Sequence, residues 1–374
     1  MHVGRRKWLK GIGMTGAATL FGPNLLGSDL SESEIRRFNP RPPETPIRLS
    51  SNENPYGPSE KVRQAMIQAF DKGCRYPGSY SLRLHEMIAE KEGVTTDHIC
   101  ITGGSTEGLK VVGLTYGKDG GEIIAARPTF LAMMSYAEIW GGSVNWVPLD
   151  DQMMHDLREM EKRISSKTKV LFLCNPNNPT STLLPPDVLR DFCETASQKT
   201  MVFSDEAYYD FIDDPNYPSM VELVKQDKNV IVSKTFSKVY GLAGLRIGYM
   251  VAKPEIIKKM RKNLMAFTNM IAIAAAEEAL RDKEFYDFSL KKTKEGKRLI
   301  YQTLDQLGLA YTPSQTNFIF FRSGVPIVEL QRKMKTQGVL IGRPFPPFDK
   351  WCRISTGTIE EVKRFNQALT EVLG

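Results

Sequence analysis

The feature that most constrains this chain is a regular alternation, from about residue 61 onward, of short apolar runs rich in β-branched residues with segments of helical periodicity. Strands that alternate with helices imply crossover connections, which build a mainly parallel sheet with helices on both faces. The alternation predicts an α/β fold with a large domain around a mainly parallel seven-stranded sheet. The predicted strands are 99–102, 122–126, 144–148, 170–174, 201–204, 230–233 and 248–251, and the helical segments between them include 106–116, 129–140 and 186–197.

The C-terminal part of the chain has a different pattern, which predicts a second, smaller α+β domain. A chain of 374 residues has room for two domains. The pattern consists of a long helical stretch over 254–297, a strand at 317–322, a helix near 325–337, short strands near 339–341 and 351–355, and a last helix over 359–373. We divide the chain into a signal segment (1–28), an N-terminal arm (29–60), a large domain (61–255), and a linking helix with the small domain (256–374).

The arm is rich in charge and proline, with prolines at positions 40, 42, 43 and 46. Such a composition predicts an extended segment that packs on the small domain or on a partner subunit.

Residues 1–28 have the layout of an export signal. They hold four basic residues and no acidic residue, and residues 11–28 are uncharged but diluted by glycine, proline and asparagine. That stretch is too polar to span a membrane as a helix. The run from Arg5 to Lys10 (RRKWLK) resembles a twin-arginine signal, so we predict an exported, periplasmic protein carried by the twin-arginine machinery. The alternative is a disordered basic tail on a cytoplasmic protein.

Charge and cysteine usage argue against a nucleic-acid partner, a metal site and a disulfide framework. The net charge is +7, but without residues 1–28 the chain carries 46 basic and 43 acidic residues, which are interspersed. That balance predicts no nucleic-acid partner. The five cysteines form no C-x-x-C pair and lie near no histidine cluster, which argues against a metal site and against a disulfide framework.

Three polar segments follow predicted strands. The glycine-rich segment 103–108 (GGSTEG) also opens a predicted helix, whose free N–H groups can hold a phosphate. Segments 174–180 (CNPNNPT) and 204–208 (SDEAY) end two further strands, and ligands bind at the carboxyl ends of strands in an open parallel sheet. Taken singly, each segment is also compatible with an ordinary turn or a helix cap.

A fourth segment, 234–238 (KTFSK), contains a lysine beside small hydroxyl residues, and Arg246 follows eight positions later. A lysine that forms a Schiff base beside an anchored phosphate requires such an arrangement. Considered alone, a lysine such as Lys238 is more often a surface lysine.

Taken in order, these segments resemble the fold-type I pyridoxal-phosphate (PLP) enzymes of the class I/II aminotransferase group, and most closely the histidinol-phosphate aminotransferases. The resemblance extends from Ile47 to the C-terminus. It rests on the motifs at 49–58 (LSSNENPYGP), 75–77 (RYP), 177–180 (NNPT), 205–208 (DEAY), 234–238 (KTFSK) and 352–355 (CRIS).

The resemblance implies pyridoxal 5'-phosphate as the cofactor and assigns the catalytic roles. Lys238 would form the Schiff base and carry the proton at the substrate Cα, Asp205 would pair with the ring nitrogen, and Tyr208 would bind the ring oxygen. Phe130 would stack on the ring, although a core aromatic is the alternative. The residues that would contact the cofactor are Ser105, Thr106, Phe130, Asn178, Asp205, Tyr208, Thr235, Ser237, Lys238, Arg246 and, across a dimer interface, Tyr76.

For the substrates, the resemblance implies a small-molecule amino donor, a 2-oxo acid acceptor and a homodimer with shared sites. Arg353 resembles the arginine that clamps a carboxylate. Asn52, Tyr56 and Arg343 are further candidates for the substrate pocket, with turn formation, packing and a solvated charge as the respective alternatives.

The chain departs from the family pattern at two positions. Ser181 replaces the usual glycine after the 177–180 turn, and Lys234 occupies a position often held by arginine. Two other functions remain open at this point: a different PLP reaction on the same fold, such as that of a decarboxylase, lyase or oxidase, and a non-catalytic binding protein on an inherited scaffold.

Overall fold

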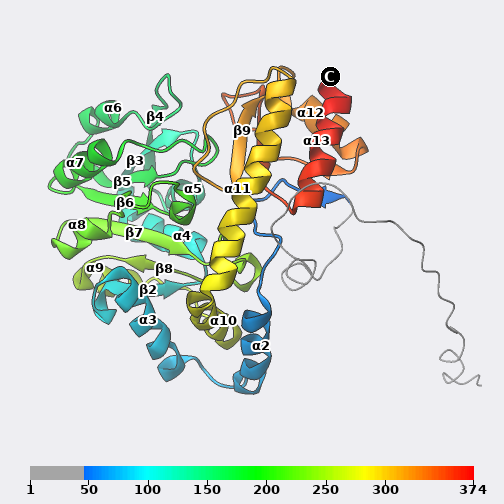
Figure 1. Cartoon of the computed structure of the whole chain (residues 1–374). Helices are drawn as coiled ribbons and strands as arrows, with labels where there is room; N and C mark the ends of the chain where they lie inside the picture. Colours follow the sequence, from blue (N-terminus) through cyan, green and yellow to red (C-terminus); the bar gives the residue numbers. More distant parts are fainter. Residues whose placement is uncertain (1–45) are drawn as a thin grey trace, which may run out of the picture.

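The computed structural model describes residues 46–374, so the predicted signal segment and the arm residues 29–45 lie outside the described residues. The described chain forms a large unit around a central sheet and a smaller unit, with the long helix α11 (Lys283–Gln306) running along both (Figure 1). The helices are α2 (Glu60–Ala69), α3 (Leu82–Glu92), α4 (Ser105–Gly117), α5 (Ala132–Ile139), α6 (Leu157–Lys162), α7 (Pro186–Ala196), α8 (Val221–Lys225), α9 (Pro254–Arg261), α10 (Met270–Arg281), α11, α12 (Ile327–Thr336) and α13 (Ile359–Leu373).

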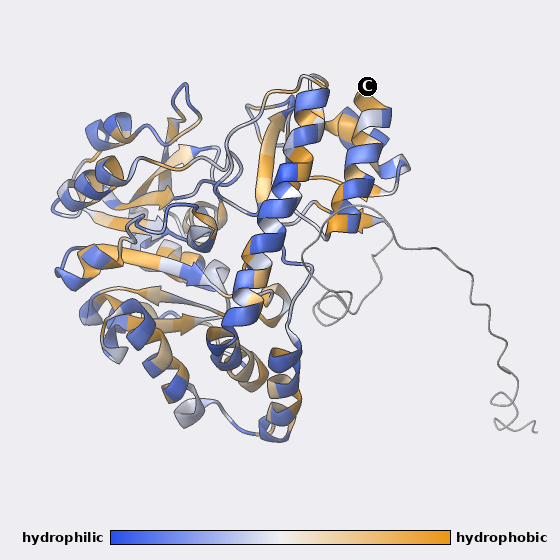
Figure 2. Ribbon diagram, in the orientation of Figure 1, coloured by the Kyte–Doolittle hydropathy of each residue, from blue (hydrophilic) through white to orange (hydrophobic). Residues whose placement is uncertain are grey.

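The central sheet confirms the predicted seven-stranded, mainly parallel sheet. Its strand order is β2-β8-β7-β6-β5-β3-β4, and only β8 runs antiparallel to its neighbours. The strands are β2 (Ile99–Thr102), β3 (Glu122–Arg127), β4 (Ser143–Pro148), β5 (Thr168–Cys174), β6 (Met201–Asp205), β7 (Val230–Thr235) and β8 (Gly248–Val251). They are mostly apolar in Figure 2, as expected for strands that helices cover on both faces.

Alternate residues of each strand point to opposite faces of the sheet, so two cores form. In β5, Val170 and Phe172 pack with α4, α5 and α9, whereas Leu171 and Leu173 pack with α3, α7, α8 and α10. We call the side of Val170 and Phe172 the α4 face and the side of Leu171 and Leu173 the α3 face. Burying both faces is what the continuous apolar runs require.

The smaller unit is built on a third core. Antiparallel strands β9 (Phe318–Arg322) and β11 (Trp351–Ser355) pack with α11, α12 and α13. The arm joins this unit: β1 (Ile47–Arg48) pairs in parallel with β10 (Val339–Leu340), and Ile47 is fully buried. The start of the arm, Ile47–Arg48, thus lies against the smaller unit.

The long helical pattern predicted over 254–297 is wrong as one element. The chain forms α9, α10 and α11 there, because Asn269 and Asp282 accept hydrogen bonds from Ala272 N and Phe285 N and so cap two new helices. The predicted boundary at residue 255 also misplaces α10, which buries its alanine-rich side in the core of the large unit. No helix within residues 46–374 is long and apolar enough to cross a membrane.

Candidate active site

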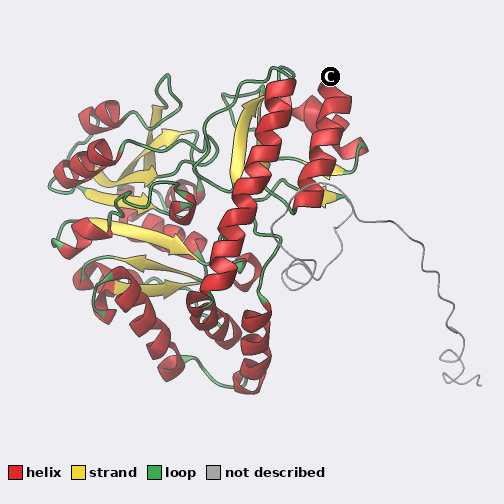
Figure 3. Ribbon diagram, in the orientation of Figure 1, coloured by secondary structure: helices red, strands yellow, loops and turns green. Residues whose placement is uncertain are grey.

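A cavity of about 290 Å³ lies where the parallel strands of the large unit end, and in Figure 3 the arrowhead of β7 points to this side, toward α11. Its volume is at the lower end of the range for ligand pockets. The arm, the start of α4, the segment after β6 and the β7–β8 connection all contribute to its wall. The lining residues are Ser51, Asn52, Glu53, Ser105, Thr106, Phe130, Asp205, Ala207, Tyr208, Ser237, Lys238, Ala243 and Arg246.

One end of this cavity can bind an anion. Helix α4 begins there with Gly104 as its N-cap and no side-chain cap, so the first N–H groups of a 13-residue helix face the cavity. Gly104 has a φ of 81°, and a Cβ atom there would overlap the Arg246 guanidinium. Arg246 Nη1 lies 3.5 Å from Ser237 Oγ, and Thr235 Oγ1 donates to Ser237 Oγ at 3.0 Å. A guanidinium, two hydroxyls and a helix N-terminus therefore converge.

Lys238 is a partly buried lysine whose amine binds its proton less tightly than a free lysine does. Its Nζ donates to the Asn52 carbonyl oxygen at 2.7 Å and lies 5.4 Å from the centre of the Tyr208 ring. Burial lowers the pKa of Lys238 to about 8, and the nearby positive charge of Arg353 acts in the same direction, while Asp205 opposes it. Roughly a tenth of the amine is therefore neutral and nucleophilic at pH 7.

Asp205 ends β6 and is 2 % exposed. Burial raises the pKa of Asp205 to about 7, the Ala207 N–H and the charge of Lys238 oppose this rise, and the negative charge of Glu206 adds to it. A buried carboxylate favours a cationic or proton-donating partner, because such a partner stabilises the negative charge that burial has separated from water.

A hydrogen-bond network connects the arm to the rest of the site. Asn52 Nδ2 and Asn178 Nδ2 donate to the Tyr208 hydroxyl at 2.9 and 3.2 Å. Arg353 Nη1 donates to Asn178 Oδ1 at 2.9 Å, and its Nη2 donates to the Ser50 carbonyl oxygen. Burial raises the pKa of the Tyr208 hydroxyl, so it remains protonated at neutral pH.

Arg353 has donor capacity to spare. Its Nε is buried and has no hydrogen-bond partner within residues 46–374. Burial also lowers the pKa of Arg353, with the charge of Arg343 adding to the effect. A buried guanidinium with an unused donor favours an anionic ligand group beside it.

The structure therefore brings most predicted site residues together, either in the cavity wall or one hydrogen bond behind it. Thr235 and Asn178 belong to the second group, and Arg353 lies one hydrogen bond further back, behind Asn178. Three predicted residues lie elsewhere: Tyr56, Arg343 and Tyr76.

The Tyr56 hydroxyl accepts a hydrogen bond from Ile359 N, and its ring lies edge-on to Phe288, so Tyr56 packs in the interior instead of lining the cavity. Arg343 is exposed, and its guanidinium lies 4.2 Å from the centre of the Phe345 ring. Tyr76 is 88 % exposed and lines a different, larger cavity.

Both departures from the family pattern have a structural explanation. Ser181 has a φ of 59°, the left-handed region that favours glycine, and its hydroxyl donates to the Thr180 carbonyl oxygen. Lys234 does not face the cavity, because its Nζ pairs with Glu92 at 2.8 Å on the α3 face.

Sequence reasoning missed five residues. Ser51, Glu53, Ala207 and Ala243 line the cavity, and Ser355 Oγ donates to Asn52 Oδ1 at 2.6 Å. Four of them lie within motifs that were recognised, namely 49–58, 205–208 and 352–355, so membership of the motif was the available signal. Ala243 carries no chemical signal.

The residues present fit pyridoxal 5'-phosphate. The α4 N-terminus with Arg246 matches its phosphate, Asp205 matches its ring nitrogen, and Lys238 supplies an amine for its carbonyl carbon. Phe130 lines the same cavity and provides an aromatic face. By contrast, residues 46–374 contain no cluster of side chains suited to a metal ion.

Known proteins share this fold and much of this sequence. Residues 44–369 match the protein family described as Aminotransferase class I and II. A histidinol-phosphate aminotransferase from Moorella thermoacetica is 38% identical over 331 residues, 87% of this chain and 85% of that protein. One from Caldicellulosiruptor saccharolyticus is 36% identical over 330 residues, 87% and 92% of the two chains. The crystal structure of histidinol-phosphate aminotransferase from Sinorhizobium meliloti, in complex with pyridoxal-5'-phosphate, superposes with a TM-score of 0.82 at 26% identity, covering 96% of this chain and 98% of that one.

Proposed function

Because this chain belongs to the class I and II aminotransferase family and is a PLP-dependent aminotransferase, we propose that Lys238 is its catalytic lysine and that it moves an amino group from an amino acid or amine to a 2-oxo acid. The observation that carries this assignment is that the partly buried Lys238 lines one cavity together with the buried Asp205 and the uncapped N-terminus of α4.

Each residue of the cavity has a task in this reaction. Bound PLP supplies an electrophilic carbonyl carbon and a ring that accepts the electron pair left when the substrate loses its Cα proton. Lys238 Nζ would hold PLP at its carbonyl carbon and, when free and neutral, would take the proton from the substrate Cα and deliver it to that carbon of PLP. The Asp205 carboxylate holds a proton at the ring nitrogen. Arg246, Ser237 and the α4 N-terminus bind the phosphate.

The remaining residues orient the ring and the substrate. The Tyr208 hydroxyl, fixed by Asn52 and Asn178, orients the oxygen substituent of the ring. Arg353, which already contacts Asn178 and has an unused Nε, binds the anionic group of the substrate. Two guanidinium groups flank the Phe345 ring, since Arg353 lies 5.1 Å and Arg343 4.2 Å from its centre. We assign the anionic end of the donor to this side of the site.

The two half-reactions test this function directly. PLP-loaded protein is mixed separately with glutamate, aspartate, histidinol, histidinol phosphate and other amino donors, and the visible absorption of the cofactor is followed. One donor is expected to abolish the visible absorption, and a 2-oxo acid is expected to restore it. An absorption that no donor changes would refute transamination and favour another PLP reaction, and a protein that binds no PLP would refute the enzyme altogether.

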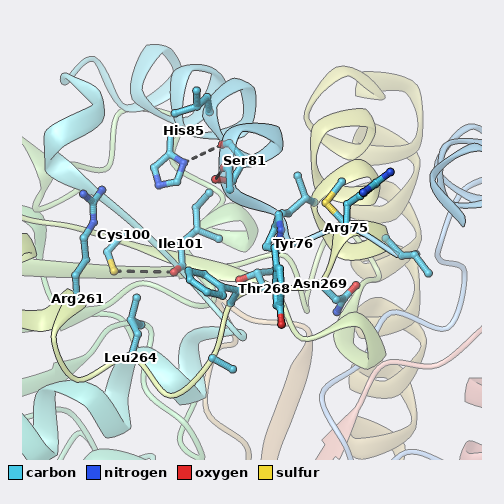
Figure 4. Close-up of a pocket in the computed structure, with 18 of the residues that line it drawn as sticks. Arg75, Tyr76, Ser81, His85, Cys100, Ile101, Arg261, Leu264, Thr268 and Asn269 are labelled. Carbon is cyan, nitrogen blue, oxygen red and sulfur yellow. Dashed lines mark hydrogen bonds between the residues drawn. The ribbon is translucent and has the colours of Figure 1, made fainter. Parts of the chain in front are cut away.

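We propose that the protein is a homodimer with shared sites. Figure 4 shows Tyr76 in the wall of an open cavity, which has a volume of about 1380 Å³. Leu82, Met265 and Phe267 line the same cavity, and all four side chains are largely exposed. An apolar surface of this kind typically marks a protein interface. The cavity adjoins the phosphate end of the active site, because Met265 N donates to Glu107 Oε1 and Asn269 Nδ2 donates to the Leu245 carbonyl oxygen.

Light scattering and PLP affinity test the dimer together. A dimer is expected in solution, and Tyr76→Phe is expected to weaken PLP binding about tenfold, through loss of one hydrogen bond to the phosphate of the partner's site. Tyr80→Phe is the control, because Tyr80 is also partly exposed but does not line this cavity. A monomer, or a Tyr76→Phe variant with unchanged affinity, would contradict shared sites.

We also propose export of the folded protein by the twin-arginine route, supported by the run from Arg5 to Lys10 and the uncharged stretch after it. Cell fractionation tests this proposal. The protein is expected outside the cytoplasm, and the double variant Arg5→Lys/Arg6→Lys is expected to remain inside. Finding both proteins in the cytoplasm would refute it.

A further inference from the structure

A buried cluster of charges on the α3 face has no task in the mechanism above. It consists of Glu92 at the end of α3, Glu206 directly after β6, and Lys234 in β7, with Tyr249 of β8 beside them. Glu92 is 7 % and Glu206 4 % exposed, and the side chain of Lys234 is 12 % exposed. Charges in such surroundings are expensive unless each has a partner.

The cluster is tightly connected. Lys234 Nζ lies 2.8 Å from Glu92 Oε2 and 3.6 Å from Glu206 Oε2. The Tyr249 hydroxyl donates to Glu92 Oε1 at 2.6 Å. Glu206 also accepts hydrogen bonds from Ser219 Oγ at 2.6 Å and from Met220 N at 2.8 Å. One ammonium is therefore shared by two carboxylates.

Strand alternation places this cluster directly behind the active site. The Asp205 side chain points to the α4 face, as the Phe203 side chain does. The Glu206 side chain points to the α3 face, as the side chains of Val202 and Ser204 do. In β7, Lys234 likewise points away from the cavity, although Thr235 and Ser237 after it belong to the phosphate end. Glu206 is thus the sequence neighbour of the carboxylate that faces the cofactor's ring.

The charges of the cluster affect one another. Burial raises the pKa of Glu206, and Lys234 opposes this rise. Burial would also raise the pKa of Glu92, but Lys234 and Lys91 hold it below its usual value. Burial would lower the pKa of Lys234, yet Glu206 and Glu92 raise it. The negative charge of Glu206 in turn raises the pKa of Asp205.

Other titratable groups also face the cluster. They are Lys91, Cys193, Tyr209, Asp210, Tyr217 and Tyr240. Because burial raises the pKa values of the cysteine and of these tyrosines, they remain neutral near neutral pH. Lys234 therefore supplies the buried positive charge that balances the two carboxylates.

We propose that Lys234 is a positioning residue for the cofactor: by pairing with Glu206 and Glu92 behind Asp205, it keeps the Asp205 carboxylate ionised so that Asp205 can hold the proton on the ring nitrogen. This inference rests on the proposed function. It predicts that removing the charge of Lys234 and removing that of Glu92 act in opposite directions on Asp205. Simple structural damage would act in the same direction in both variants.

The test measures the affinity of the apoprotein for PLP by equilibrium dialysis between about pH 5.5 and about pH 9. In Lys234→Met, the negative charge of Glu206 has lost its positive partner. The midpoint is the pH, on the acid side of the profile, at which the PLP affinity has fallen by half, and we expect it about one pH unit higher than in the wild type. In Glu92→Gln the midpoint is expected to move down. Lys234→Arg is expected to restore the wild-type profile. Titration of PLP itself is common to all variants and cancels.

Controls separate this effect from a loss of folding. Lys199→Met removes a surface ion pair with Glu161 and is expected to leave the midpoint unchanged. Equal midpoints in the wild type, Glu92→Gln and folded Lys234→Met would overturn the inference while leaving the proposed function intact. If Lys234→Met does not fold, Glu92→Gln decides alone: a midpoint that stays or rises overturns the inference. A wild-type protein that binds no PLP would overturn both.

Discussion

Lys238 shows how a single side chain acquires its reactivity from its surroundings. It has one hydrogen-bond acceptor, the Asn52 carbonyl oxygen, and it lies where burial and Arg353 favour the neutral amine. Lysine at the protein surface remains protonated and unreactive at neutral pH. The sequence motif identified the residue, but the lowered pKa depends on burial and on Arg353, which lies more than a hundred residues away in the chain.

We expect Lys238→Ala to lower the rate of amino transfer by roughly 10³-fold, because no other group in the cavity moves the Cα proton. PLP should still bind through the phosphate end and Asp205. The rate is measured with the best donor, and retention of PLP by dialysis. Normal turnover in this variant would show that another residue performs the catalytic role.

Ser181 has a strained backbone conformation, which the sequence indicated only through the replacement of the usual glycine. Its φ of 59° is unfavourable for a residue with a Cβ atom, and its hydroxyl compensates in part by bonding to the Thr180 carbonyl oxygen.

Ser181→Ala removes the hydroxyl and keeps the strain, whereas Ser181→Gly removes both. The glycine variant should therefore be more stable than the alanine variant by about 1 kcal/mol, measured by urea denaturation. Equal stabilities would mean that the positive φ costs nothing here.

At the scale of elements, the start of α4 matters most, because it combines a helix terminus with the Arg246 guanidinium. Gly104→Ala places a methyl group against that guanidinium at a φ of 81°. We expect PLP affinity to fall about tenfold, the equivalent of one charge-assisted hydrogen bond.

Gly120→Ala is a matched control, since Gly120 has the same φ and nothing lies within 4 Å of its added Cβ. It should lose stability but keep its PLP affinity. If both variants keep their affinity for PLP, the contribution of Arg246 to PLP binding does not require the absence of a side chain at position 104.

The connection between β4 and α6 contains a buried imidazole that makes folding sensitive to pH. His155 Nε2 donates to the Cys174 carbonyl oxygen at 3.0 Å, and burial lowers the pKa of His155 to about 4. The unfolded chain has a pKa near 6.5 and binds the proton more readily, so stability falls as the pH drops from about 6.5 toward 4.

Between pH 7 and pH 5 this difference amounts to about 2 kcal/mol. His155→Gln, whose amide can still donate to Cys174, should lose that much less stability over this interval, as measured by urea denaturation at both pH values. An identical loss in the two proteins would exclude His155 as the source.

At the scale of the whole molecule, the large unit was predictable because its strands are buried on both faces and have a clear pattern. The predicted strands 99–102 and 248–251 match β2 and β8, and the others differ from the observed ones by one or two residues at an end. The break between α9, α10 and α11 was not predicted, since it depends on caps at Asn269 and Asp282 within a continuous helical pattern. Assigning α10 to the large unit requires contacts with α2 and α3 that no local pattern contains.

The candidate site was predictable wherever chemistry and motif coincide, as at Lys238, Asp205 and Arg246. Tyr56 was misplaced because some residues of the motif 49–58 line the cavity and others pack in the interior. The arm is irregular there, so the sequence has no periodicity that shows which residues face the cavity. The role of Lys234 was inaccessible for a different reason. Its partner Glu92 is distant in sequence and gives no signal of its own.

The most direct test of the account is to identify the lysine that PLP modifies. The protein is incubated with PLP, reduced with borohydride and digested, and the peptides are analysed by mass spectrometry. We expect a phosphopyridoxyl group on Lys238, absent from Lys238→Ala. Modification of a different lysine, or of none, would contradict it.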